Sequence, residues 1–353
     1  MSTQPSSPQI SIIMPCYNRA HGIARILRAY DRQSGETPFE LIAVDDGSTD
    51  DTLSTLRHFQ PQRFTLRVES MITNSGPAAA RNRGIDLARA PLVAFVGDDI
   101  CPATDFVQAH TRAHDEEPRE ATAILGRTIW PLDLPRTALM THIDGIGAQQ
   151  FSYRYMRDGQ CYDFRHLYTS NVSLKKSFLQ AHGGHFDTIF TYAAFEDGEL
   201  ARRLERHGLR IRYHADIVAT HYHYYSARTF ADRQYKCGLM SWVFIRKHPS
   251  VFTKLAPSAC LRLILKSILV SAQRTPEGHV ALEERAQQIA AEYEAAPAPA
   301  LDGLYFALLQ YYYCKGQATA VCEKWQRLPR ILDQLAVLAL QKPIIDFLRS
   351  ADR

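Results

Sequence analysis

The first hundred residues alternate between short apolar runs and segments with helical spacing, and this alternation limits the chain to few folds. Short apolar runs are typical of strands buried on both faces, whereas apolar residues three and four apart indicate one face of a helix. The alternation predicts an α/β fold with a doubly wound, mostly parallel sheet. The predicted strands are 10–14, 41–44, 64–68 and 92–96, and the predicted helices are 19–32, one that begins after Ser48 or Asp50, and 76–88.

The same pattern continues more loosely to about residue 225. Strands are expected at 121–129 and 209–218, with a helix at 196–207 between them. Leu200 and Leu204 stand four apart and mark the inward face of this helix. The sheet is therefore expected to gain strands from this part of the chain.

Beyond Ser226 the sequence has helical spacing almost throughout. We therefore expect an α/β domain over residues 1–225 and an α-helical C-terminal region over residues 226–353. Alternating Ala and Pro predict a break in this region near 296–300.

Composition and charge narrow the compartment and the partners. The 41 Lys and Arg residues are interleaved with 37 Asp and Glu residues, which favours no nucleic-acid partner but allows a phosphate-bearing small molecule. The 7 cysteines are scattered without a CxxC pair, as expected of free thiols in a reducing cytoplasm. The sequence has no signal-peptide pattern and no run of about 18 apolar residues, so a cytoplasmic location without a membrane span is expected.

Polar residues interrupt the apolar runs where the predicted strands end. Ligands of open α/β sheets bind beyond the carboxyl ends of the strands, which selects residues 15–18, 45–48 and 97–100. Asp98 and Asp99 directly follow a buried strand, where their charge is costly unless it is compensated. A Mg²⁺ or Mn²⁺ ion shared with substrate phosphates would compensate it, although a solvated turn that caps the next helix is an equal alternative.

Two further acidic pairs also have structural alternatives. The segment DGSTD, residues 46–50, is typical of turns and helix caps, and that structural role explains it by itself. The functional alternative is a hydrogen bond from a base or ribose to Asp45 or Asp46. Glu196 and Asp197 stand at a predicted helix N-terminus, where the helix dipole favours acidic residues. The functional alternative makes Asp197 a general base that removes a proton from an acceptor hydroxyl.

Basic and imidazole groups complete the candidate site. Arg81 and Arg83 lie in the helix after Gly76, from which one of them could reach a diphosphate, although helices often carry surface arginines. His221 and His223 follow the strand at 209–218 and share one face if that strand continues. Structural packing and metal ligation are equally good explanations of this pair.

Six sequence blocks occur in order and resemble one known family. They are SIIMPCYNR, LIAVDDGSTDDT, NSGPAAARNRGI, LVAFVGDDICP, GGHFDTIF and FEDGELARRL. Together they closely resemble family 2 glycosyltransferases of the GT-A fold, over residues 10 to about 225. The resemblance implies a Rossmann-like GT-A domain and a hexosyltransferase of class EC 2.4, as in polysaccharide biosynthesis. It also implies inverting, metal-assisted transfer from a nucleoside-diphosphate sugar to a hydroxyl of a glycan or lipid-linked acceptor.

The resemblance assigns roles to individual residues. The catalytic base is Asp197, with Glu196 beside it, and the cation, Mn²⁺ or Mg²⁺, is held by Asp99 with His221 or His223. Many relatives carry Asp where this chain has Gly97, so Asp99 is the one firmly assigned metal ligand. The residues assigned to the nucleotide sugar are Pro15, Tyr17, Asn18, Asp45, Asp46, Gly76, Arg81 and Asp98.

Asp46 fits the imide of uracil as a hydrogen-bond acceptor, so UDP is expected before GDP. A nicotinamide dehydrogenase is disfavoured because GxGxxG is missing after the first strand, and a sugar nucleotidyltransferase because a Gly-rich loop is missing there. A processive synthase would carry a QxxRW motif and membrane spans, so transfer of one sugar per encounter is expected. A degenerate, non-catalytic GT-A scaffold draws its support from Gly97.

The helical tail carries basic amphipathic stretches at 227–247 and 261–269. Such helices lie on membranes in some proteins and pack into cores or dimer interfaces in others. The tail therefore leads to two hypotheses: peripheral contact with the inner face of a membrane, consistent with a lipid-linked acceptor, and a homodimer through the tail.

Overall fold

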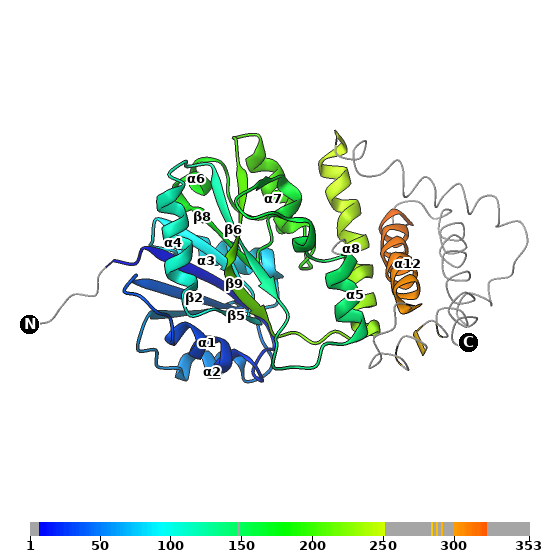
Figure 1. Ribbon diagram of the computed structural model, residues 1–353, viewed down its shortest axis with the longest axis horizontal. Coiled ribbons are helices and arrows are strands. Elements are labelled where there is room, and N and C mark those ends of the chain that lie inside the picture. The colour runs from blue at the N-terminus through cyan, green and yellow to red at the C-terminus, as the bar shows by residue number, and fades with distance from the viewer. Residues whose placement is uncertain are drawn as a thin grey trace, which may run out of the picture. The chain divides into compact units, whose positions relative to one another are not determined.

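The computed structural model describes residues 7–146, 149–250, 284, 287–288, 291 and 300–322. The described residues of Met1–Leu134 and Phe151–His223 form one compact unit, and those of Pro135–Gln150 and Tyr224–Arg353 form a second (Figure 1). The stretch 135–150 thus groups with the later part of the chain. The domain division at residue 225 stays a prediction.

In the described part of the chain, nine strands form one mixed sheet with the order β3-β2-β1-β4-β8-β6-β9-β5, and β7 pairs with β9. The strands β1, β2, β3 and β4 pair in parallel, whereas β8 runs antiparallel to both of its neighbours. The strands are β1 Ile10–Cys16, β2 Phe39–Asp45, β3 Thr65–Ser70, β4 Leu92–Val96, β5 Ile100–Pro102, β6 Thr122–Ile129, β7 Cys161–Tyr162, β8 Asn171–Lys175 and β9 Arg210–His221.

Helices cover both faces of this sheet. They are α1 Ile23–Asp31, α2 Thr52–His58, α3 Pro77–Leu87, α4 Phe106–Glu116, α6 Lys176–Ala181 and α7 Glu196–Glu205, with 3₁₀ turns η1 Tyr153–Tyr155 and η2 Phe164–His166. Ile12 and Met14 join a core that contains residues of α1 and α4, while Ile13 joins a second core with residues of α3 and α7. Alternate residues of β1 therefore bury opposite faces, as period-two side-chain geometry requires. The predicted α/β class is confirmed.

Helix α1 begins at Ile23 rather than at residue 19, because the preceding residues are held elsewhere. The backbone N–H of Arg19 donates to Thr52 Oγ1 at 2.6 Å, and that of Ala20 donates to Asp50 Oδ2 at 3.1 Å. These bonds hold the backbone of residues 19 and 20 to the side chains of Asp50 and Thr52. They also join the loop after β1 to the segment where α2 begins, beside the site described below.

The second unit is helical in its described residues, with α5 Ala138–Ile146, α8 Ala227–Lys247 and α12 Ala300–Cys322. Ser226 and Thr229 form a capping box at the start of α8. Helices α8 and α12 approach closely, since a Cβ atom at Gly238 would lie 2.0 Å from Tyr313 O. Among the described residues, no helix is long and apolar enough to cross a membrane. The basic stretch at 261–269 and, apart from Ala300, the break at 296–300 lie outside the described residues.

Candidate active site

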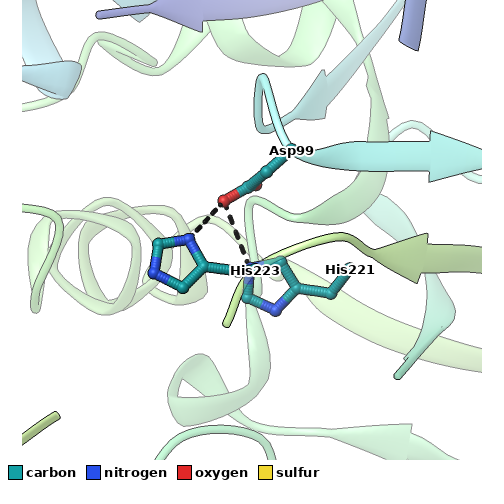
Figure 2. Close-up of side chains that lie close together, drawn as sticks. All are labelled: Asp99, His221 and His223. Atoms are coloured by element: carbon teal, nitrogen blue, oxygen red, sulfur yellow. Dashed lines mark hydrogen bonds and ion pairs between the residues drawn. The ribbon is translucent and has the colours of Figure 1, made fainter. Parts of the chain in front are cut away.

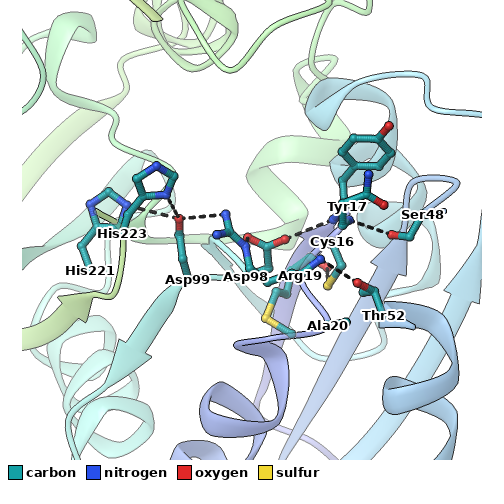
Figure 3. Close-up of polar contacts among 12 residues, drawn as sticks. Cys16, Tyr17, Arg19, Ala20, Ser48, Thr52, Asp98, Asp99, His221 and His223 are labelled. Carbon is teal, nitrogen blue, oxygen red and sulfur yellow. Dashed lines mark hydrogen bonds and ion pairs between the residues drawn. The ribbon is translucent and has the colours of Figure 1, made fainter. Parts of the chain in front are cut away.

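The loops that follow β1 and β2 are bonded to each other by both backbone and side chains (Figure 3). The backbone N–H of Asn18 donates to Ser48 Oγ at 3.0 Å, and the N–H of Thr49 donates to Asn18 Oδ1 at 2.8 Å. Asn18 adopts the left-handed conformation, with φ 50°, which asparagine tolerates better than most residues. The PCYNR and DDGSTD blocks therefore form one continuous surface at the carboxyl end of the sheet.

Asp45 and Asp46 are both buried but have different partners. Asp46 accepts backbone N–H groups through both oxygens, from Ser75 at 2.8 Å and from Gly76 at 2.8 Å. Burial raises the pKa of Asp46, and these N–H groups oppose the rise. Asp45 Oδ2 accepts from the N–H of Ser48 at 3.3 Å, while its buried Oδ1 has no hydrogen-bond partner among the described residues. Asp45 is thus the residue of this pair that keeps one carboxylate oxygen to accept a further hydrogen bond.

Two contacts bring the start of α7 to the start of α3. Gly76 has φ 88°, and a Cβ atom there would lie 2.9 Å from Thr191 O, so only glycine fits this approach. Arg81 on α3 forms a buried ion pair with Glu196 on α7, with Nη1 and Oε1 2.9 Å apart. In the described structure, Arg81 Nε and Glu196 Oε2 are buried without a hydrogen-bond partner. The FED block therefore lies beside the loop that Asp46 holds.

Asp197 differs from Glu196 in its exposure. Glu196 is 2% exposed, whereas Asp197 is half-buried and accepts the N–H of Gly198 through Oδ1 at 2.7 Å. Phe195, directly before the pair, is left-handed with φ 67°, an uncommon conformation for an aromatic residue. Such strain persists where the surrounding structure imposes it and is frequent at functional sites. Asp197 is the member of the pair that a substrate could reach.

Asp98 and Asp99 are joined to the first loop by Arg19. The N–H of Tyr17 donates to Asp98 Oδ2 at 3.1 Å. Arg19 donates through Nε to Asp98 Oδ1 at 3.1 Å and through Nη2 to Asp99 Oδ2 at 3.2 Å. Burial and the neighbouring charge of Asp99 raise the pKa of Asp98 to about 6, although Arg19 opposes the rise.

Asp99, His221 and His223 converge on one point (Figure 2). Asp99 Oδ2 lies 3.3 Å from His221 Nε2 and 3.0 Å from His223 Nδ1. The antiparallel pairing of β5 with β9 sets this geometry, because it places Ile100 opposite His221. Burial would raise the pKa of Asp99, but His221, His223 and Arg19 outweigh it and hold the pKa well below its ordinary value.

The three residues offer one carboxylate oxygen and two imidazole nitrogens within 4.8 Å of one another. Carboxylates suit Mg²⁺ and Mn²⁺, and imidazole is a common ligand of divalent metals, so this donor set fits a divalent cation. A second group within the described residues, Asp158, His214 and Asp216, is mostly exposed, and exposed acidic groups are common without a metal. The first group is therefore the better candidate.

The predicted site residues thus form three neighbouring groups. Tyr17, Asp98, Asp99 and the two histidines share one polar cluster, Asn18, Asp45, Asp46 and Gly76 shape the adjoining loops, and Arg81 pairs with Glu196. Pro15 lies in β1, opposite Val44 of β2. The functional roles of all these residues stay predictions.

Two residues contact the predicted site residues in ways that the sequence did not predict. Arg19 bridges both carboxylates after β4, and Trp130 stacks on His221 with ring centroids 5.3 Å apart. Arg19 stands directly after the PCYN block, which is the one sequence signal that could have drawn attention to it. Trp130 directly follows β6 and lies in none of the six sequence blocks.

Comparison with known proteins supports the expected family. The model of the family described as "Glycosyl transferase family 2" matches residues 11–181. The expected likeness to family 2 glycosyltransferases is thereby confirmed over nearly half of the chain. The predicted enzyme class, EC 2.4, is thereby confirmed, and the dehydrogenase and nucleotidyltransferase alternatives are set aside.

Named relatives of this glycosyltransferase align over much of its length. Validoxylamine A glucosyltransferase from Streptomyces hygroscopicus subsp. jinggangensis is 29% identical over 306 residues, which cover 80% of this chain and 70% of the relative. The uncharacterized glycosyltransferase YfnE from Bacillus subtilis is 26% identical over 252 residues, which cover 60% of this chain and 64% of that protein. The chain thus spans about two-thirds of each relative.

A solved structure shares the fold of this glycosyltransferase. It is the mannosyltransferase PcManGT from Pyrobaculum calidifontis in complex with GDP-Man and Mn²⁺, which aligns with a TM-score of 0.56 at 17% identity. The alignment covers 92% of this chain and 89% of that chain. At this identity the likeness supports the fold.

Proposed function

We propose that this glycosyltransferase moves a single sugar, with inversion, from a UDP-sugar to a hydroxyl of a glycan or lipid-linked acceptor. The observation that carries the proposal is the convergence of Asp99, His221 and His223 beside Asp98. This cluster is bonded through Tyr17 to the loop that follows β1. The complex of the similar mannosyltransferase with GDP-Man supports a nucleotide-sugar donor. The alternative function is a non-catalytic scaffold that binds the same ligand.

We assign base recognition to Asp45. Both oxygens of Asp46 already accept backbone N–H groups, whereas Asp45 has one buried oxygen without a hydrogen-bond partner among the described residues. A uracil imide offers one N–H to such an oxygen, while guanine presents two donors side by side. One open acceptor therefore favours UDP over GDP. The ring of Tyr17, 44% exposed at the start of the loop after β1, is available to stack on the base.

Asp99 with His221 and His223 would hold Mn²⁺ or Mg²⁺. The mixed oxygen and nitrogen donors favour Mn²⁺, because imidazole suits transition metals better than Mg²⁺. When bound, the cation supplies positive charge for the departing diphosphate. Asp98 is oriented by the N–H of Tyr17 and by Arg19, so its carboxylate is held next to the loop that follows β1.

Asp197 acts as the general base in this proposal. Its half-exposed carboxylate accepts the proton of the acceptor hydroxyl while the hydroxyl oxygen attacks the anomeric carbon. Attack from the face opposite the diphosphate inverts the configuration. Glu196 is buried against Arg81 and therefore positions α7 rather than exchanging protons with substrate. Arg81 likewise acts through Glu196 instead of reaching the diphosphate.

Gly97 weakens the scaffold alternative. A Cβ atom at this position would lie 2.8 Å from Asp99 Oδ1, so a larger residue would displace the Asp99 carboxylate. Glycine therefore accommodates Asp99 in this chain, and the missing acidic residue is no sign of a decayed site. The half-exposed Asp197 also remains in place.

A donor screen tests the proposal. Purified protein is incubated with UDP-, GDP- and dTDP-sugars, with Mn²⁺ and sugar acceptors, and the anomeric configuration of the product is read by NMR. We expect an inverted product from a UDP-sugar, and a loss of about 10²–10⁴-fold in the transfer rate of Asp197→Asn with nucleotide binding kept. A donor that binds but is neither hydrolysed nor transferred would favour the scaffold alternative.

A further inference from the structure

Arg19 places one guanidinium across two carboxylates (Figure 3). Its Nε lies 3.1 Å from Asp98 Oδ1 and its Nη2 lies 3.2 Å from Asp99 Oδ2. The backbone of Arg19 is fixed as well, because its N–H donates to Thr52 Oγ1. The side chain is 19% exposed, so solvent screens this pairing only in part.

The oxygen that Arg19 contacts is the oxygen that a metal would use. Asp99 Oδ2 is 3.2 Å from Arg19 Nη2, and it is also the atom nearest to His221 Nε2 and His223 Nδ1. A divalent cation that binds through Oδ2 must share or displace the guanidinium. Two like charges brought to one carboxylate oxygen repel each other strongly at this range.

We propose that Arg19 is a resident counter-cation that weakens the binding of a free divalent ion, so that the ion binds tightly only together with the donor diphosphate. Asp98 and Asp99 alone would carry two negative charges and attract a metal without nucleotide, and Arg19 cancels one of them. The diphosphate adds negative charge and oxygen ligands, which restore the attraction. The inference rests on the proposed metal-assisted function and assigns Arg19 the control of its cation dependence.

A purely structural role for Arg19 predicts the opposite sign. If Arg19 served only to hold Asp98 and Asp99 in place, its loss would let both carboxylates move and would weaken metal binding. If it is a counter-cation, its loss strengthens metal binding. The direction of the change therefore separates the two roles.

Titration calorimetry with MnCl₂ alone, without nucleotide, makes this measurement on wild type and three variants. Arg19→Gln removes the charge, Arg19→Lys keeps it, and Arg28→Gln removes the same charge from an exposed position on α1. We expect Arg19→Gln to bind Mn²⁺ at least about tenfold more tightly than wild type, with Arg19→Lys and Arg28→Gln close to wild type. Thermal melts confirm that each variant is folded, and Arg19→Met replaces Arg19→Gln if the latter is not.

Unchanged or weaker Mn²⁺ binding by the neutral variant would overturn the proposal. Equal tightening in Arg19→Lys would also overturn it, because the charge would then not be the cause. A parallel titration with Mn²⁺ and UDP keeps the two proposals apart. If wild type binds no UDP, the proposed function fails, while the comparison with Mn²⁺ alone still decides the role of Arg19.

Discussion

The indole of Trp130 lies nearly parallel to the imidazole of His221, with ring centroids 5.3 Å apart and planes inclined by 13°. Trp130 is 5% exposed, so its own position is fixed by packing. The stacked indole restricts the rotation of the His221 ring and thereby directs Nε2 toward Asp99. Trp130 is in this sense a positioning residue for the candidate metal site.

Replacing Trp130 is expected to weaken the metal site indirectly. Partners that orient metal ligands typically contribute about 10–100-fold to metal affinity, so we expect a loss in this range for Mn²⁺ binding to Trp130→Leu in the presence of UDP. Trp130→Phe keeps an aromatic face and should lose much less. Calorimetry gives the affinities, and urea unfolding corrects for lost stability. Equal Mn²⁺ affinity in the Leu and Phe variants would contradict this positioning role.

Enlarging Gly97 is expected to disturb Asp99 without removing any ligand. An alanine Cβ would lie 2.8 Å from Asp99 Oδ1 and 3.2 Å from the Ile100 side chain. We expect Gly97→Ala to lower Mn²⁺ affinity in the presence of UDP about tenfold, because the carboxylate must turn away from the histidines. Gly303→Ala is the control for a glycine with open space around it, and it should leave the affinity unchanged. An unaltered Mn²⁺ affinity in Gly97→Ala would show that Asp99 is not held in this orientation.

The buried ion pair of Arg81 and Glu196 makes a prediction about stability. Removing one partner leaves the other charge buried, which typically costs about 3–5 kcal/mol. We therefore expect Arg81→Met and Glu196→Gln each to lower the free energy of unfolding by an amount in this range. The double variant should lose less than the sum of the two, as measured by urea unfolding of all four proteins. Strict additivity would mean that the two side chains do not interact in solution.

Two buried histidines make the fold sensitive to acid. His110 and His114 both contact Ser173, with His110 Nδ1 2.8 Å and His114 Nε2 2.9 Å from its Oγ. Burial lowers the pKa of His110 to about 4 and that of His114 to about 3. Between these values and about pH 6.5, the unfolded chain binds protons that the folded chain does not. The contribution of the two histidines to the free energy of unfolding should therefore be fully present above pH 6.5, and it should decrease as the pH falls below that value.

Each histidine contributes a slope of up to about 1.4 kcal/mol per pH unit in that window. His114→Gln keeps an amide for Ser173 but cannot titrate, so its stability should fall less steeply between pH 6.5 and pH 4. His58→Gln, at an exposed position, should keep the wild-type slope. Urea unfolding at several pH values gives the three slopes. The same slope for wild type and His114→Gln would rule out this source of acid sensitivity.

These histidines also explain why the sequence pattern did not predict strand β8. Strands β1, β2 and β4 are buried on both faces and therefore read as apolar runs. Strand β8 has the sequence NVSLK, in which the buried residues Asn171 and Ser173 are polar. Their hydrogen-bond partners, His110 and His114, come from α4, about sixty residues earlier in the chain. No local pattern marks a polar face as buried when its partners are that distant.

The candidate site could be predicted only in outline for a related reason. Strand ends and family blocks located the acidic pairs, because such features are local. The members of each pair were not separable, since neighbours such as Asp45 and Asp46 differ only in which distant N–H groups they meet. Burial then separated Glu196 from Asp197. The bridging of Asp98 by Arg19, seventy-nine residues earlier, likewise needs the folded chain.

The most direct measurement of the central claim is calorimetric titration of UDP, GDP and dTDP, each with and without Mn²⁺. Wild type is compared with Asp99→Ala and with Asp216→Ala, which removes an exposed carboxylate from the second acidic and histidine group. We predict Mn²⁺-dependent binding of UDP that Asp99→Ala abolishes and Asp216→Ala preserves. Binding of UDP that ignores Mn²⁺ and Asp99, or binding of none of the three nucleotides, would contradict the account.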